Sequence, residues 1–97
     1  MAMREVTKQT FEDEVKAGSV LVDFSTKWCP PCRALMPVLH ALAAQGVEVR
    51  TIDAEDNREL AEHYDVRAFP TVIVFHDGKP GKRIIGAASK EKLLALL

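Results

Sequence analysis

The chain has 97 residues, of which 47% are hydrophobic and 28% are charged. This length fits one domain over residues 1–97 with a modest core, and the composition argues against disorder. Thirteen basic and fourteen acidic residues nearly cancel, and no block of like charge indicates a nucleic-acid or membrane partner. The segment from Met1 to Lys16 has no apolar stretch of signal-peptide length, so we expect no export signal.

The N-terminal part of the chain predicts a helix and an apolar strand. Thr10 and the acidic residues after it are typical of a helix start with a hydroxyl cap, and Gly18 is expected to end this helix. Residues 20–24 form a short, β-branched apolar run, which predicts a strand covered on both faces. A further short strand is expected near Val6.

A long amphipathic helix is predicted next. Four apolar residues recur at positions i, i+3, i+4 and i+7 and form one stripe: Leu35, Val38, Leu39 and Leu42. Gly46 is expected to end this helix, and residues 47–52 predict a second strand. A strand, a helix and a strand at this spacing indicate a parallel βαβ unit with a right-handed crossover.

Two shorter helices are predicted in the remaining half of the chain. Asp56 or Asn57 is expected to cap a helix that runs to Tyr64, and Ser89 is expected to cap a last, leucine-rich helix.

Between these two helices the pattern is that of a β-hairpin. Residues 71–76 are an apolar strand, Asp77-Gly78 is a turn signal, and residues 82–85 return beside Pro80, which suits an edge strand. All the elements together predict an α/β domain of three layers, with a mixed sheet of four to five strands flanked by about four helices.

The chain contains only two cysteines, Cys29 and Cys32. A small secreted scaffold would need more cysteines to stabilise its core, so this pair is expected to be reactive and not architectural. Pro30 biases Cys29 towards extended dihedrals, which a helix cap requires. Pro30 and Pro31 fit the first helical turn, where their missing N–H groups have no intrahelical acceptor.

This placement predicts different roles for the two thiols. The positive end of the helix dipole and the free N–H of Cys32 favour a thiolate at Cys29 and lower its pKa. Cys32 lies one turn inside the helix and is expected to remain a thiol until it resolves a mixed disulfide.

Other interpretations of the cysteine pair have less support. A structural zinc site would need two more ligands, and His40, His63 and His76 lack the spacing of a zinc finger. A haem attachment motif would have histidine where Arg33 stands. We therefore expect a redox pair with no metal and no bound cofactor, and we assign the histidines to surface or packing positions.

Over essentially its whole length the chain resembles the thioredoxin family. The matching motifs occur in family order: Val22-Asp23-Phe24, Trp28-Cys29-x-Pro31-Cys32, Pro37, Val66-Arg67-x-x-Pro70-Thr71, Gly78 and Gly86-Ala87. The resemblance implies a thioredoxin fold. It also implies that Asp23 is a buried acid managing the proton of Cys32, although a satisfied core aspartate is the alternative.

The resemblance further implies a substrate groove around the cysteines. Trp28 would shield the disulfide and form a groove wall, although simple packing is the alternative. The cis bond of Pro70 would expose the backbone of Phe69 for pairing with an extended substrate, and Gly86 would open the groove. The expected substrate-binding residues are Trp28, Pro30, Pro31, Phe69, Pro70, Gly86 and Ala87.

The sequence departs from the family pattern at three positions. Pro30 stands where glycine is common, Ser25 where a second tryptophan is usual, and Thr51 where a lysine usually neighbours the buried aspartate. The double proline also resembles the motif of tryparedoxins and nucleoredoxins, but this chain has no room for their insertions. Strand alternation places Arg50 on the opposite face from Thr51, so it is a poor replacement for that lysine.

The resemblance implies a cytoplasmic, monomeric protein-disulfide reductase. Disulfide-containing proteins would be its substrates, and a thioredoxin reductase using a flavin and NADPH would restore its dithiol. Two alternatives remain open at this point. One is an oxidant or isomerase, since the residues between the cysteines tune the redox potential. The other is a non-catalytic binding module.

Overall fold

A computed structural model describes residues 3–97, and Met1 and Ala2, where the expected domain starts, lie outside the described residues. The strands are β1 (Met3–Glu5), β2 (Ser19–Ser25), β3 (Val49–Asp53), β4 (Thr71–His76) and β5 (Lys79–Ile85). The helices are α1 (Phe11–Val15), α2 (Pro30–Ala44), α3 (Arg58–His63) and α4 (Lys90–Leu94). This order confirms the predicted α/β fold.

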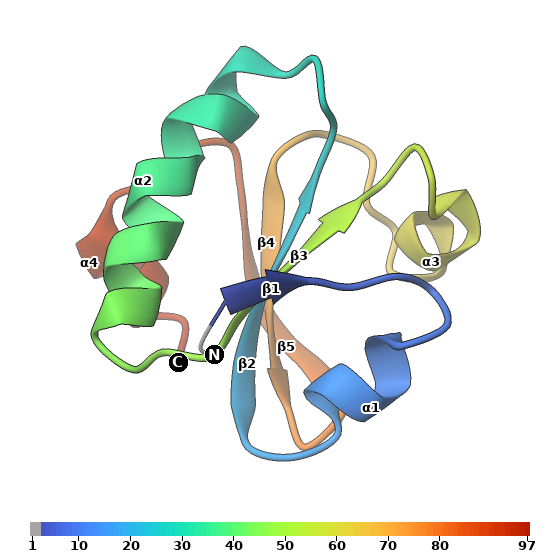
Figure 1. The fold of residues 1–97 in the computed structure, drawn as a ribbon, viewed down its shortest axis with the longest axis horizontal. Helices are drawn as coiled ribbons and strands as arrows, with labels where there is room; N and C mark the ends of the chain where they lie inside the picture. The colour runs from blue at the N-terminus through green and yellow to red at the C-terminus, as the bar shows by residue number, and fades with distance from the viewer. Residues whose placement is uncertain (1–2) are drawn as a thin grey trace.

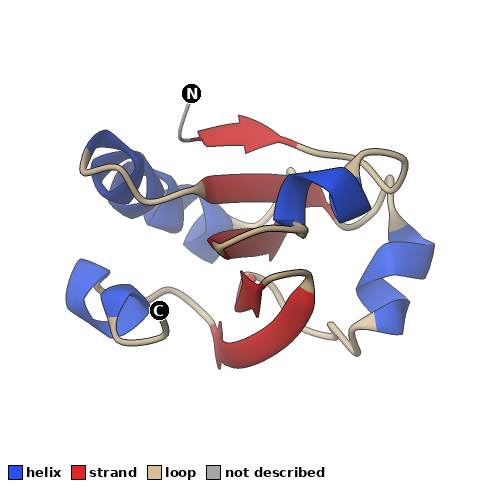
Figure 2. Ribbon diagram, turned by 90° about the horizontal axis from the view of Figure 1, so that it is seen from below, coloured by secondary structure: helices blue, strands red, loops and turns tan. Residues whose placement is uncertain are grey.

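The five strands form one mixed sheet in the order β1-β3-β2-β4-β5. β3 runs parallel to both β1 and β2, whereas β4 is antiparallel to both β2 and β5. Helices α2 and α4 cover one face of the sheet, and α1 and α3 lie on the other side (Figure 1). Figure 2 shows the strands as a twisted stack between these two helical layers. The parallel pairing of β2 and β3 confirms the predicted βαβ unit.

Each face of the sheet has its own apolar core. β2 and β4 are central strands covered on both faces, so their alternate residues enter different cores. Both faces of these strands are therefore apolar, and the sequence of each strand is a continuous apolar run. On the α2 side the core comprises Leu21, Leu35, Leu39, Leu42, Val49, Val72, Val74, Leu93 and Leu96. On the α1 side it comprises Val6, Phe11, Val15, Val20, Val22, Phe24, Ile52, Ala54, Ala61, Val66, Ile73 and Phe75.

Strand β5 begins earlier than the sequence predicted. It starts at Lys79 and includes Pro80, because an edge strand tolerates a residue without an N–H donor. The pairing with β4 is irregular between Ile73 and Phe75, and a side chain at position 81 would crowd the carbonyl of Val74. Gly81 therefore lets the edge strand approach its neighbour at the irregularity.

Thr10 and Asn57 occupy N-cap positions as predicted, but neither side chain makes a capping hydrogen bond. The Thr10 side chain makes no capping bond to α1, and its Oγ1 instead accepts from the N–H of Thr7 at 3.0 Å. Asn57 precedes α3, but its side chain donates to the carbonyl of Asp53 and accepts from the N–H of Lys8. A local contact thus replaces the capping bond at Thr10, and at Asn57 the side chain bonds to Lys8 and Asp53 instead. Ser89 does cap α4, and its Oγ accepts from the N–H of Lys92 at 3.2 Å.

Arg50 lies on the α1 face of the sheet, as strand alternation predicted. Its guanidinium is buried and donates to Glu14 of α1 at 2.6 Å and to Glu48 at 2.7 Å. Arg4 also contacts Glu14, and the two guanidinium groups hold the pKa of this carboxyl below its usual range. This charge network therefore joins β1, α1 and β3 on the face away from Asp23.

No helix among residues 3–97 combines the length and the apolar composition needed to cross a membrane.

Candidate active site

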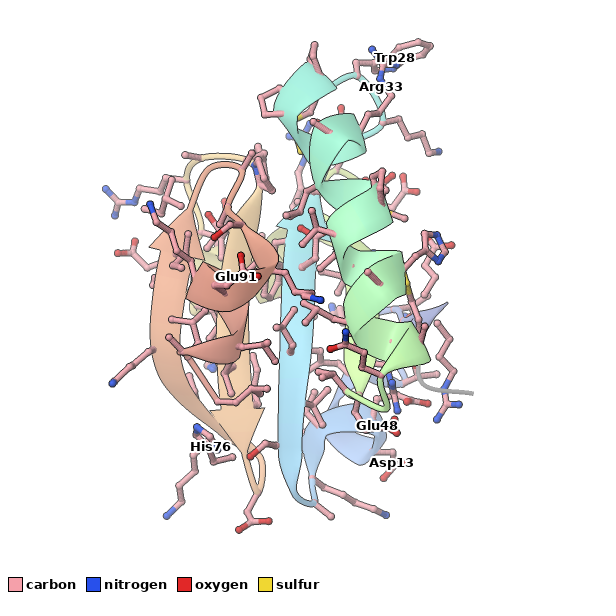
Figure 3. All side chains as sticks on the ribbon, turned by 90° about the vertical axis from the view of Figure 1, so that its left-hand side faces the viewer. Asp13, Trp28, Arg33, Glu48, His76 and Glu91 are labelled. Carbon is pink, nitrogen blue, oxygen red and sulfur yellow. A yellow bond between two sulfur atoms is a disulfide. The ribbon has the colours of Figure 1, made fainter. Side chains whose placement is uncertain are left out.

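The sheet topology brings three separate segments to one edge. The loop with the cysteines follows the end of β2, the Phe69-Pro70 segment precedes β4, and Gly86 follows β5. The pairings Phe24↔Thr71 and Thr71↔Ile85 place these three strand ends side by side. Trp28 and Arg33 mark this end of the molecule in Figure 3, and Asp13, Glu48 and His76 lie at the opposite end. The segments predicted to carry the site thus meet in space.

The cysteine pair opens α2 as the sequence predicted. Cys29 is the N-cap residue with extended dihedrals (φ −111°, ψ 105°), and the two prolines occupy the first turn. Cys29 and Cys32 form a disulfide with a Cα–Cα distance of 5.2 Å. The Cys29 sulfur accepts from the N–H of Cys32 at 3.2 Å. A negative charge on this sulfur would therefore be stabilised by a helix N–H and by the dipole.

The two sulfur-bearing residues differ in exposure. Cys29 is half-buried, whereas Cys32 is only 3% exposed. An incoming molecule can reach the Cys29 side of the pair more readily, so the geometry suits attack at Cys29 and internal resolution by Cys32.

The Phe69-Pro70 segment faces Cys29. The peptide bond between these residues is cis, and the Phe69 carbonyl oxygen lies 3.6 Å from the Cys29 sulfur. The N–H of Gly86 donates to the carbonyl of Pro70 at 2.7 Å, which connects the end of β5 to this segment. Pro70 is buried and Ala87 is exposed. Their expected role in substrate binding stays a prediction.

Trp28 is 82% exposed, so it does not pack in a core. Its ring projects outward from the cysteine end of the molecule, near Arg33 (Figure 3). In this position the ring extends the surface beside Cys29 and does not lie over the body of the domain. Pro30 and Pro31 are exposed on the same loop, where an approaching chain could contact them.

Lys27 anchors the Trp28 loop to the neighbouring loop. Its Nζ lies 3.9 Å from a carboxylate oxygen of Asp53 and 3.8 Å from one of Asp56. The sequence analysis missed these contacts, because the residues are about thirty positions apart and nothing in the local pattern pairs them. The parallel pairing of Ser25 with Asp53 brings the two loops together.

Asp23 is completely buried in the middle of β2. Neither of its carboxylate oxygens has a hydrogen-bond partner among the described residues. Burial raises the pKa of Asp23 to about 7, and the nearby Ser25 hydroxyl opposes this rise without completing a hydrogen bond. A satisfied core aspartate would have partners, so the structure contradicts that alternative. A carboxyl with such a pKa can accept and return a proton near neutral pH.

A pocket of about 280 Å³ lies beside Cys32. Its lining includes Ser25 and Thr51, which the sequence analysis named as departures from the family but not as site residues. No sequence pattern indicates that these hydroxyls border one cavity, because β2 and α2 must first dock onto β3. The lining residues are Glu5, Ser25, Thr26, Lys27, Cys32, Arg33, Met36, Thr51, Ile52 and Asp53.

Residues 3–97 contain no group of three or more His, Cys, Asp or Glu residues positioned to hold a metal ion. A helix-opening dithiol on an α/β sheet, with a buried carboxyl behind it, defines a thiol-disulfide oxidoreductase.

Comparison with known proteins gives the same class. The thioredoxin family model matches residues 2–97. The thioredoxin of Chlamydia trachomatis serovar D is 40% identical over 94 residues, which cover 95% of this chain and 92% of that protein. The thioredoxin of Staphylococcus aureus is 39% identical over 100 residues, covering 100% of this chain and 96% of that protein.

Solved structures agree with these relatives. A mutant thioredoxin from Halobacterium salinarum superposes with a TM-score of 0.91 at 36% identity, covering 97% of this chain and 86% of that chain. Thioredoxin from Malassezia sympodialis superposes with a TM-score of 0.83 at 26% identity, covering 96% and 85% of the two chains. The chain belongs to the thioredoxin family, and its activity is that of a protein-disulfide reductase.

The proline after Cys29 should affect both stability and reactivity. Pro30→Gly restores freedom to the unfolded chain and should lower the free energy of unfolding by about 0.4–1 kcal/mol. The new N–H at the start of α2 should stabilise the thiolate and lower the pKa of Cys29. Denaturant unfolding of the oxidised form and the pH dependence of Cys29 alkylation measure the two effects.

Pro80→Gly is the matched control for this variant. Pro80 is exposed on edge strand β5, remote from the cysteines, so this change should leave the pKa of Cys29 as in the wild type. A pKa of Cys29 that stays unchanged or rises on Pro30→Gly would contradict the proposed influence of the missing donor on the thiolate.

Proposed function

We propose that the protein runs as a reductant in which Cys29 is the attacking thiolate and Cys32 the resolving thiol. Cys29 attacks one sulfur of a substrate disulfide, and the other substrate sulfur leaves as a thiolate. Cys32 passes its proton to Asp23 and attacks the Cys29 sulfur, which releases the second substrate thiolate. Two electrons thereby pass to the substrate, and the Cys29–Cys32 disulfide forms.

The observation that carries this assignment is the asymmetry of the pair. Cys29 is half-buried and accepts the N–H of Cys32, whereas Cys32 is buried, and burial raises the pKa of the Asp23 carboxyl to about 7, so that it can take a proton near neutral pH. A non-catalytic binding module would have no need for this arrangement. The groove residues named above would bind an extended segment of the substrate, with the Phe69 backbone beside the reacting sulfur.

The proposal extends to partners and location. The substrates would be disulfide-containing proteins, and a thioredoxin reductase that uses a flavin and NADPH would return the electrons. The whole chain, residues 1–97, would act as one monomeric domain with no cofactor of its own. Its two cysteines are both in the redox pair, which suits the reducing cytoplasm, where structural disulfides are rare.

The redox potential of the Cys29–Cys32 pair tests the direction of electron flow. A reductant should have a potential near about −270 mV, whereas an isomerase lies near about −180 mV and a strong oxidant near about −120 mV. Equilibration of the protein with defined ratios of reduced and oxidised glutathione measures this value. A potential in the isomerase or oxidant range would replace the proposed direction with the alternative, even if catalysed disulfide reduction were observed with excess dithiol.

A further inference from the structure

Neither carboxylate oxygen of the buried Asp23 has a hydrogen-bond partner among the described residues, yet two residues with hydroxyl groups are its neighbours on the sheet. Thr51 is its register neighbour on β3, and Ser25 follows it on the same face of β2. On its other side the neighbour is Val72 of β4, which offers no polar side chain. Of the two neighbouring strands, only β3 therefore offers a polar side chain in register with Asp23.

The pocket beside Cys32 lies on that side. Ser25, Thr51 and Cys32 all line it, whereas Cys29, Trp28, Phe69, Pro70 and Gly86 do not. It is thus separate from the surface around Cys29. Its volume of about 280 Å³ has space for several water molecules, since each occupies about 30 Å³ in the liquid.

Charged side chains reach this pocket from two strands, one helix and one loop. Glu5 comes from β1, Asp53 from β3, Lys27 from the loop before α2, and Arg33 from α2 itself. The one lysine among them is engaged with Asp53 and Asp56. The lining therefore contains side chains of both charges together with the hydroxyl groups of Ser25 and Thr51, and these polar groups can hold water.

When a substrate is bound at Cys29, a proton path that avoids the Cys29 side of the site is needed. In the mixed disulfide, the substrate covers the Cys29 side of the site, and the proton that Cys32 loses must still leave through Asp23. We propose that the pocket is the route by which Asp23 exchanges this proton with solvent, and that Thr51 is a positioning residue whose hydroxyl holds the connecting water. This inference rests on the proposed role of Asp23 in resolving the mixed disulfide.

The test follows the resolving step alone. Reduced protein reacts with dithiobis(nitrobenzoate) in two phases, because attack by Cys29 releases one coloured thiolate and resolution by Cys32 releases the second. Thr51→Val removes the hydroxyl from a β-branched side chain of similar shape, so the strand should be retained. The second phase should slow about tenfold at neutral pH, since this is the effect expected when one hydrogen bond to the connecting water is lost.

The pH profile separates positioning from a structural effect. Loss of the hydroxyl disfavours the charged carboxylate, so the second phase of Thr51→Val should accelerate only at higher pH than in the wild type. The first phase should keep its wild-type rate. Thr51→Ser retains the hydroxyl and should restore both the rate and the profile. Slowing of both phases, or failure of Thr51→Ser to restore the second, would overturn the proposal.

Asp23→Asn tests the proposed role of Asp23 separately from the proposed route through the pocket. If Asp23→Asn slows the second phase and Thr51→Val keeps the wild-type profile, the route through the pocket is wrong and the proposed function stands. If Asp23→Asn also keeps the wild-type profile, Asp23 does not accept the proton of Cys32. Both the proposed role of Asp23 and the route through the pocket are then wrong.

Discussion

Cys32→Ser should accumulate a stable mixed disulfide on Cys29, and Cys29→Ser should accumulate almost none. The half-buried Cys29 can still attack a substrate disulfide when Cys32 is absent, but no second thiol remains to release the adduct. The reverse variant retains only Cys32, which is 3% exposed and one turn inside α2. Trapping should therefore be close to stoichiometric in one variant and at background in the other.

A protein substrate with one disulfide and intact-mass measurement under non-reducing conditions provide the readout. The double variant with serine at both positions is the control, because it retains the fold and lacks both thiols. Comparable trapping by the two single variants would contradict the division of labour between Cys29 and Cys32.

Asp23→Asn should raise the stability of the oxidised protein at neutral pH. The pKa of Asp23 is raised to about 7 from an unfolded value of 3.8, because burial disfavours the charged form. The native state therefore holds this proton at pH values where the unfolded state has already released it. Stability is greatest below the unfolded pKa, falls as the pH rises from about 4 to about 7, and then stays low.

The size of this effect follows from the same two pKa values. The gap between 3.8 and about 7 corresponds to a loss of about 4 kcal/mol once the pH exceeds the folded pKa. An asparagine here keeps unpaired polar atoms, which costs about 1–3 kcal/mol, so the net gain above pH 7 should be about 1–3 kcal/mol. The variant should also release the mixed disulfide more slowly, because Cys32 loses its proton acceptor.

Denaturant midpoints from acid to alkaline pH measure this difference. The oxidised form is used because its cysteines do not titrate. Asp13→Asn, an exposed carboxyl on α1, is the control and should keep the pH dependence of the wild type. Parallel curves for the wild type and Asp23→Asn would show that Asp23 is solvated or paired in solution.

Most of the elements could be predicted because local signals and tertiary contacts agree. The apolar run at residues 71–76 became β4 with the predicted bounds, and the cysteine motif opened α2 with its prolines in the first turn. The predicted capping bonds failed where the side chain found another partner. The Asn57 side chain bonds to Asp53 and to the distant Lys8, and the Thr10 hydroxyl bonds to the nearby Thr7, so neither side chain caps its helix.

The sequence by itself determined where the two cysteines lie at the start of α2. Two cysteines three positions apart, with prolines that suit a helix start, specify which thiol lies at the cap and which lies inside. It also indicated a buried acid at Asp23, because a carboxyl within an apolar strand must enter a core.

Only the tertiary structure decided what surrounds that pair. The Phe69 carbonyl reaches Cys29, and Ser25 and Thr51 border a pocket with Cys32, across separations that no periodicity records. Local sequence sets the conformation of a segment, but the docking of helices and strands sets which distant groups meet. Whether Asp23 has a hydrogen-bond partner depends on that docking, and so does the pH at which it gives up its proton.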